Sequence, residues 1–153
     1  DYLVENNHIG SRIRILSNNI RLAVDRKLNS LGLTGQQSFV LRYLSMHDGE
    51  VVYPKDIEKR FNLTHPTVSG LLQRLEAKGF ITCIPDPDDR RYKRVAITPS
   101  AREIQAEICR HIQSIEQTMI AGMRDDEVET FIRLLDMAAE NIIAENQKEE
   151  SDL

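Results

Sequence analysis

The stretch that decides the fold spans residues 64–79 and reads THPTVSGLLQRLEAKG. Thr64 is a favourable N-cap, because its hydroxyl can accept a hydrogen bond from a free backbone N–H of the first helical turn. Pro66 is tolerated because it falls in that same turn, where its missing N–H would have no partner. Gly79 then ends the segment, as glycine commonly does just past a helix. The pattern predicts a helix from about His65 to Lys78.

The two faces of this predicted helix differ in chemistry. At about 100° per residue, one face collects the apolar side chains: Val68, Leu71, Leu72 and Leu75. The opposite face and its flanks carry small or hydrogen-bonding residues: Pro66, Thr67, Ser69, Gly70, Gln73, Arg74 and Ala77. Gly70 costs about 1 kcal/mol relative to alanine in a helix interior, and packing gives no reason for it on a solvent face. Such a face suits a helix that enters the major groove of DNA, where hydroxyl and amide groups read base edges. The alternative is an ordinary polar surface helix.

The preceding residues predict a second short helix. Pro54 suits its first turn, and the helix extends to about Phe61. Residues 62–64 then form a three-residue turn. Two short helices joined in this way constitute a helix-turn-helix. Further upstream, Thr34 and Gln37 have the spacing of a capping box at the start of another helix.

The following residues predict a two-stranded hairpin, or wing. Residues 80–84 and 92–97 are expected to be its strands, joined by the turn-rich segment 85–91. Arg90 and Arg91 stand at its tip, where a guanidinium could enter a narrow minor groove. Asp89 is interpreted as a support that holds one of them in place. Lys93 and Arg94 would contact phosphates. The alternative is a solvated, charged hairpin.

Three amphipathic helices flank this segment. Apolar residues recur at steps of three and four over residues 5–30, again after the N-cap Thr98 and Pro99, and again from Asp125 to Ile142. The polar tail from Glu145 to Leu153 is expected to be frayed. Either these stripes fold back as additional core, or they form a two-fold interface, which a palindromic DNA site would require. We favour the interface. The expected fold is therefore mainly α with a small β wing: a winged helix-turn-helix lobe at 34–98 flanked by dimerisation helices at 5–30 and 99–146, in one domain over 1–153.

Charge is distributed unevenly along the 153 residues. The net charge is −4, yet residues 54–98 hold nine basic and six acidic side chains, a net +3, whereas residues 99–153 hold five basic and thirteen acidic ones, a net −8. This asymmetry indicates a basic binding face on an acidic body.

These motifs together resemble the MarR family of bacterial regulators. The resemblance covers about residues 5–146. It rests on sets of residues in three regions: Leu33-Thr34, Gln37, Val40-Leu41 and Leu44; Thr67-Val68-Ser69, Leu72, Arg74-Leu75-Glu76 and Lys78-Gly79-Phe80-Ile81; and Asp88-Asp89-Arg90-Arg91 with Ile97-Thr98. It implies a dimeric winged-helix transcriptional regulator, often a repressor, that binds pseudo-palindromic DNA. In many members a small aromatic or phenolic ligand releases the DNA.

The resemblance also bears on individual residues. The family's minor-groove arginine corresponds to Arg90 or Arg91. Many members carry arginine at the position of Gly70, where it contacts DNA or pairs with the wing aspartate, so its absence shifts base reading onto neighbouring residues. The predicted DNA-contacting set is His65, Thr67, Ser69, Gly70, Gln73, Arg74, Asp89, Arg90, Arg91, Lys93 and Arg94.

Other functions find less support in the sequence. No catalytic constellation, phosphate-binding loop or cofactor motif is present, so we expect neither an enzyme nor a bound cofactor or metal. Cys83 and Cys109 form no CxxC motif and are expected to be reduced thiols. The alternatives on the same fold are a redox sensor that uses Cys83 or Cys109, a zinc-responsive regulator that uses His8, Glu107, Cys109 and His111, and a winged helix that binds only proteins. No run of about 18 apolar residues and no secretory-signal pattern occurs, so we expect a cytoplasmic protein.

Overall fold

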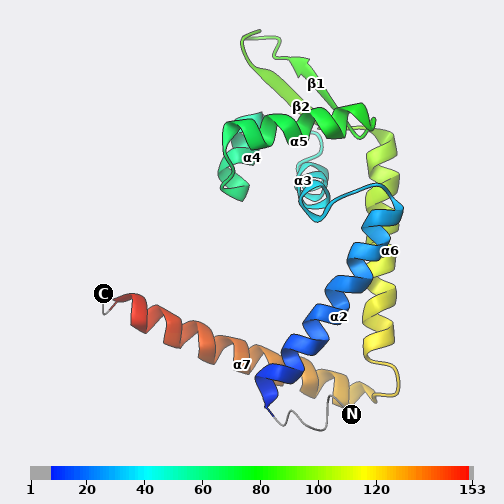
Figure 1. Ribbon diagram of the computed structural model, residues 1–153, viewed down its shortest axis with the longest axis vertical. Coiled ribbons are helices and arrows are strands. Elements are labelled where there is room, and N and C mark those ends of the chain that lie inside the picture. Colours follow the sequence, from blue (N-terminus) through cyan, green and yellow to red (C-terminus); the bar gives the residue numbers. More distant parts are fainter. Residues whose placement is uncertain (1–7, 152–153) are drawn as a thin grey trace. The chain divides into compact units, whose positions relative to one another are not determined.

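The computed structural model describes residues 8–151. In chain order the elements are α2 (Ile9–Ser30), α3 (Gly35–Met46), α4 (Pro54–Phe61), α5 (His65–Ala77), β1 (Ile81–Pro85), β2 (Lys93–Ile97), α6 (Pro99–Met119) and α7 (Asp125–Ser151) (Figure 1). The expected fold class, mainly α with a small β wing, is confirmed. The chain divides into two compact units, one ending at Ile115 and the other beginning at Glu116.

Local sequence explains where the helices begin and end. Thr34 and Gln37 form the predicted capping box: each side chain accepts a hydrogen bond of 3.2 Å from the backbone N–H of the other. Thr98 caps α6 by accepting from the N–H of Ala101 at 3.2 Å. Gly79, with φ of +76°, adopts the left-handed conformation that glycine tolerates best, and it turns the chain from α5 towards β1.

The core of the first unit lies beneath α5. It is formed by the inward faces of α3, α4 and α5 together with β1, β2 and the start of α6, and its most deeply buried side chains are Val40, Leu41, Ile57, Val68, Leu71, Leu75 and Ile81. β1 and β2 are antiparallel, with Cys83 opposite Val95. The loop before α4 joins this sheet through one hydrogen bond of 2.8 Å, from the N–H of Val95 to the carbonyl of Val52.

The helices α2 and α6 lie side by side within the same unit (Figure 1). Lys27 of α2 donates to Glu107 of α6 at 2.6 Å, and the imidazole of His111 lies 3.3 Å from the carbonyl of Ala23.

The bounds of the first and last helices differ from the predicted ones. The first helix begins at Ile9, and residues 5–7 of the predicted segment lie outside the described residues. The last helix continues to Ser151, so the frayed tail expected from Glu145 onwards is wrong over most of its length. Glutamate, glutamine and lysine dominate this segment, and their high helix propensity sustains the helix without an apolar stripe. Within residues 8–151, no helix is long and apolar enough to cross a membrane.

Candidate nucleic-acid interface

The turn between α4 and α5 fixes the angle at which α5 leaves the core. Asn62 adopts a left-handed conformation, with φ of 50°, and the N–H of Leu63 donates to the carbonyl of Glu58 at 3.0 Å. Ile57 is fully buried and anchors α4 beneath the turn. The predicted helix-turn-helix is therefore present, with α5 as its second helix.

The two faces of α5 are oriented as the sequence predicted. Val68, Leu71, Leu72 and Leu75 are buried in the core. On the other side Thr67, Gln73 and Arg74 are exposed, and Ser69 and Gly70 are partly exposed. The polar outward face is thus available along the whole helix.

Gly70 is not required by packing within this chain. A Cβ atom at this position would meet only the guanidinium nitrogens of Arg74, at 3.6 and 3.9 Å. Those are ordinary van der Waals distances to the far end of a flexible side chain. Packing within the described residues therefore does not offset the cost of about 1 kcal/mol that glycine has relative to alanine in a helix interior.

His65 stands at the start of α5 with a carboxylate beside it. Its Nδ1 lies 2.8 Å from Oε1 of Glu58. Because a carboxylate can only accept a hydrogen bond, Nδ1 carries the proton, and the contact orients the imidazole at the exposed end of the helix.

At the tip of the wing, an aspartate holds an arginine in an exposed position. Arg91 donates to Asp89 from its guanidinium at 2.6 and 2.9 Å and from its backbone N–H at 3.1 Å. The side chain of Arg91 remains 83% exposed. These hydrogen bonds hold the pKa of Asp89 below its usual value. The interpretation of Asp89 as a support for an arginine thus agrees with the geometry. Arg90 is also exposed.

The base of the wing depends on a residue that sequence reasoning missed. Asp86 is only 2% exposed, and its carboxylate accepts hydrogen bonds from the hydroxyl of Tyr53 at 2.5 Å and from Nε of Arg94 at 2.9 Å. It also accepts from the backbone N–H groups of Asp88 at 2.8 Å and Asp89 at 3.2 Å. The hydrogen bonds from Tyr53 and Arg94, and then those from the backbone, hold the pKa of Asp86 far below its usual value.

The position of Arg94 differs from the one that the sequence predicted for it. The sequence placed it with Lys93 on an exposed basic strand, suited to phosphates. In the structure Arg94 is 28% exposed and directed to Asp86, whereas Lys93 is exposed. The two side chains differ because adjacent residues of a strand project to opposite faces. Arg94 is a support of the wing, and Lys93 keeps the predicted surface position.

The helix-turn-helix and the wing together enclose a hollow of about 970 Å³. Predicted residues from both elements line it: His65, Ser69 and Gln73 from the helix side, and Asp89, Arg91 and Lys93 from the wing. The remaining predicted residues (Thr67, Gly70, Arg74, Arg90 and Arg94) are not among its lining residues. A helix-turn-helix followed by a two-stranded hairpin defines the class of winged helix-turn-helix proteins.

Comparisons with known proteins agree with this class. The sequence model of the MarR family matches residues 31–91. MepR of Staphylococcus aureus, a transcription regulator of the multidrug efflux pump MepA, is similar in structure with a TM-score of 0.81 and 27% identity over 88% of this chain and 98% of that one. A MepR–DNA complex matches with a TM-score of 0.76 and 29% identity over 84% and 96% of the chains. MepR bound to ethidium bromide matches with a TM-score of 0.70 and 27% identity over 88% of this chain and 96% of that one. The chain is therefore similar to the MarR family over residues 31–91, which contain the helix-turn-helix, and to the transcription regulator MepR over most of its length.

The alternatives that rely on Cys83 or on a bound metal gain no support from the geometry of residues 8–151. Burial, and then the nearby Glu76 carboxylate, raise the pKa of the Cys83 thiol to about 11, so this group stays protonated near neutral pH and is a poor nucleophile. Among residues 8–151, no group of three or more histidine, cysteine, aspartate or glutamate side chains is arranged to hold a metal ion. Glu107, one of the residues considered for zinc, is paired with Lys27.

Replacing Asp86 tests the anchoring of the wing. We expect Asp86→Asn to lower the urea midpoint of unfolding, because it removes the buried carboxylate that pairs with the half-buried Arg94 at 2.9 Å. The matched control is Asp88→Asn: its carboxylate also faces Arg94, but at 3.7 Å and almost fully exposed, and a surface pair of this kind contributes little, so the midpoint should stay nearly unchanged. The folded-state pKa of Asp86 lies below the unfolded value of about 4, so its contribution is complete above that pH and declines as the pH falls further. The difference between wild type and Asp86→Asn should therefore be constant from pH 7 to 5 and shrink below pH 4. Equal midpoints at pH 7 would contradict the anchoring role.

Proposed function

We propose that this chain is a cytoplasmic, sequence-specific DNA-binding repressor that acts as a homodimer on a pseudo-palindromic operator and is released by a small ligand. The observation that carries the proposal is the shared concave surface formed by the outward face of α5 and the wing. In this proposal residues 34–98 form the DNA-binding lobe, and residues 5–30 and 99–146 supply the dimer helices.

The two parts of the surface have different tasks in this proposal. Thr67, Ser69 and Gln73 read base edges in the major groove, where their hydroxyl and amide groups can discriminate base pairs. Arg90 and Arg91 enter the adjacent minor groove, and Lys93 contacts phosphate. Gly70 lets the backbone of α5 approach the DNA closely. The similarity to MepR, which has been crystallised with DNA, supports this assignment.

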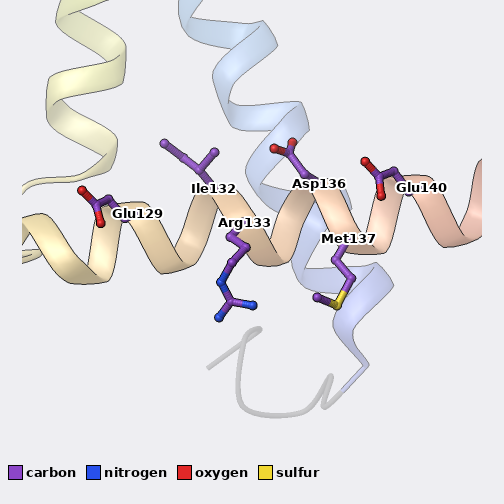
Figure 2. Close-up of a pocket in the computed structure, with 6 residues that line it drawn as sticks. All are labelled: Glu129, Ile132, Arg133, Asp136, Met137 and Glu140. Carbon is purple, nitrogen blue, oxygen red and sulfur yellow. The ribbon is translucent and has the colours of Figure 1, made fainter.

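Unpartnered apolar side chains on α7 support the homodimer. Figure 2 shows Glu129, Ile132, Arg133, Asp136, Met137 and Glu140 projecting from successive turns of this helix, where they line a shallow hollow. Ile132 is 54% exposed and Ile142 is 65% exposed. Both belong to the stripe that the sequence predicted for an interface. An exposed apolar stripe of this length is typical of a surface that another protein covers.

Repression and release follow from the geometry that DNA imposes. Operator half-sites lie about one helical turn apart, so a dimer binds tightly only while its two lobes keep that spacing. A ligand that binds better to a dimer with another spacing shifts the population away from the DNA-binding form.

Substitution of Gly70 tests the proposed entry of α5 into the groove. We expect Gly70→Leu to reduce operator affinity to the level of non-specific DNA, about a thousandfold or more. Folding should be preserved, since position 70 faces outward and leucine favours helix over glycine by about 0.5–1 kcal/mol. Operator binding is measured by fluorescence anisotropy on DNA selected from random duplexes, and stability by urea denaturation.

Gly35→Leu is the matched control. Gly35 is also helical and lies outside the proposed dimer helices, and a Cβ there would meet no heavy atom within 4 Å. This variant should bind the operator as wild type does. Wild-type affinity in Gly70→Leu would show that α5 does not enter the groove. Failure of the wild-type chain to select any DNA would favour the alternative of a winged helix that binds only proteins.

Charged substitutions on α7 test the proposed interface. We expect the double variant Ile132→Asp and Ile142→Asp to sediment at the chain mass of 17.6 kDa, whereas wild type sediments at twice that mass at micromolar concentration. The substitutions would bury two unpaired carboxylates in an apolar contact, which is strongly unfavourable. Gln147→Asp, on the polar last turns of the same helix, is the control and should remain a dimer. A dimeric double variant would exclude this stripe from the interface.

A further inference from the structure

The first residue of α5 is tied to the helix that precedes it. Nδ1 of His65 lies 2.8 Å from Oε1 of Glu58 on α4. The side chain of Glu58 is only 16% exposed, whereas that of His65 is 79% exposed. A half-buried carboxylate therefore occupies one nitrogen of an imidazole that otherwise faces solvent, and the contact directs the ring towards α4.

The second ring nitrogen, Nε2, is free. It has no hydrogen-bond partner among residues 8–151, although His65 lines the hollow between the helix-turn-helix and the wing. Because Nδ1 carries the proton that Glu58 accepts, Nε2 is an acceptor while the ring is neutral and becomes a donor only when the ring gains a second proton. Histidine is the side chain whose charge ordinarily changes between pH 5 and pH 8. What Nε2 can bind therefore depends on pH.

The charged groups around His65 favour an anion beside it. The carboxylates that line the same hollow each accept a hydrogen bond from elsewhere or face an arginine: Asp56, Glu76, Asp86, Asp88 and Asp89. Arg91 is paired with one of them. By contrast, the ammonium groups of Lys55 and Lys59 on α4 and of Lys93 on the wing form no ion pair with a described residue. Free cations on both sides of His65 attract an anion to this part of the surface.

We propose that the pair of His65 and Glu58 binds a phosphate of the DNA backbone with the imidazole doubly protonated, so that operator binding takes up one proton at each half-site. The inference deepens the proposed function and rests on it, since it makes the affinity for the operator depend on pH. The proton comes from solvent and binds to Nε2, which then donates to a phosphate oxygen while Nδ1–H stays on Glu58.

The chemistry of phosphate requires this protonation state. Phosphate oxygens can only accept hydrogen bonds, so a neutral His65 would turn the lone pair of Nε2 towards another acceptor. A hydrogen bond between an imidazolium and a phosphate is charge-assisted and stronger than a neutral one. A backbone contact also suits the position of the ring, because the first helix of a helix-turn-helix crosses the DNA backbone and Glu58 holds the ring towards that helix.

The pH dependence of operator affinity is the first test. At constant ionic strength, fluorescence anisotropy should show the affinity of the wild-type chain falling about tenfold or more from pH 6 to pH 8, because the free protein must gain protons to bind. The dependence of affinity on salt should be steeper at pH 6, by up to about one unit per half-site. An affinity that is constant over this range, or that rises with pH, would overturn the proposal.

His65→Gln separates this ring from the other groups that titrate. Glutamine cannot gain a charge, so the variant should bind the operator almost equally at pH 6 and pH 8, and more weakly than wild type at pH 6. His47→Gln is the matched control, because His47 ends α3 and does not line the hollow. It should keep the pH dependence of wild type. A pH dependence that persists in His65→Gln would assign the proton to another group.

Glu58→Gln tests the partner of the ring. Its amide oxygen can still accept from Nδ1, but the negative charge that stabilises the imidazolium is gone. The increase in affinity on acidification should therefore begin at a lower pH than in wild type. A pH profile identical to that of wild type would remove Glu58 from the site. If either variant at position 58 or 65 does not fold, the pH profile of wild type still decides.

Operators with single-base changes distinguish phosphate from the edge of guanine, whose O6 and N7 also only accept. With a phosphate contact, the loss of affinity from wild type to His65→Gln at pH 6 should be the same on every operator. A loss that disappears when one particular base pair is changed would overturn the phosphate assignment. Selection of an operator by the wild-type chain at any pH from 6 to 8 supports the proposed function by itself, so its failure and the failure of this inference are distinguishable.

Discussion

The buried carboxylate of Asp86 joins the wing to the helix-turn-helix, and without it the concave surface between α5 and the wing would have no fixed shape. Its partner Tyr53 lies directly before α4, and its other partners, Arg94 and the backbone of the loop, belong to the wing. A two-stranded hairpin alone is only marginally stable in water. Four hydrogen bonds to one carboxylate fix its base to the body of the lobe. The positions of Arg91 and Lys93 relative to α5 follow from that attachment.

Much of the fold could be predicted because its signals are local. The capping box at Thr34 and Gln37 and the N-cap at Thr98 depend on residues three positions apart, and the inward face of α5 depends on helical periodicity. The outward face could be predicted for the same reason, since it is the complement of the buried one. The pairing of Asp89 with Arg91 is also local, as the two residues are separated by only one position.

The parts that could not be predicted depend on contacts distant in sequence. Asp86 and Tyr53 are 33 positions apart, and nothing in either local segment indicates that the hydroxyl reaches the carboxylate. An aspartate before a proline indicates a turn. This local signal does not show that the carboxylate of Asp86 also accepts a hydrogen bond from a residue far away in the sequence. Arg94 was misplaced for the same reason, because its partner became visible only in the folded hairpin.

Cleavage of DNA by an iron chelate attached to the protein is the most direct test of whether α5 lies in the major groove and the wing tip in the minor groove. In a chain carrying Cys83→Ser and Cys109→Ser, an iron chelate is attached through Gln73→Cys or, in a separate protein, through Arg90→Cys. Hydroxyl radicals released in the minor groove cut the two strands with an offset towards their 3′ ends, and those released in the major groove cut with the opposite offset. The account predicts the 3′ offset from position 90 at the edges of each half-site and the opposite offset from position 73 at its centre. The same offset from both positions, or cleavage spread evenly along the DNA, would contradict it.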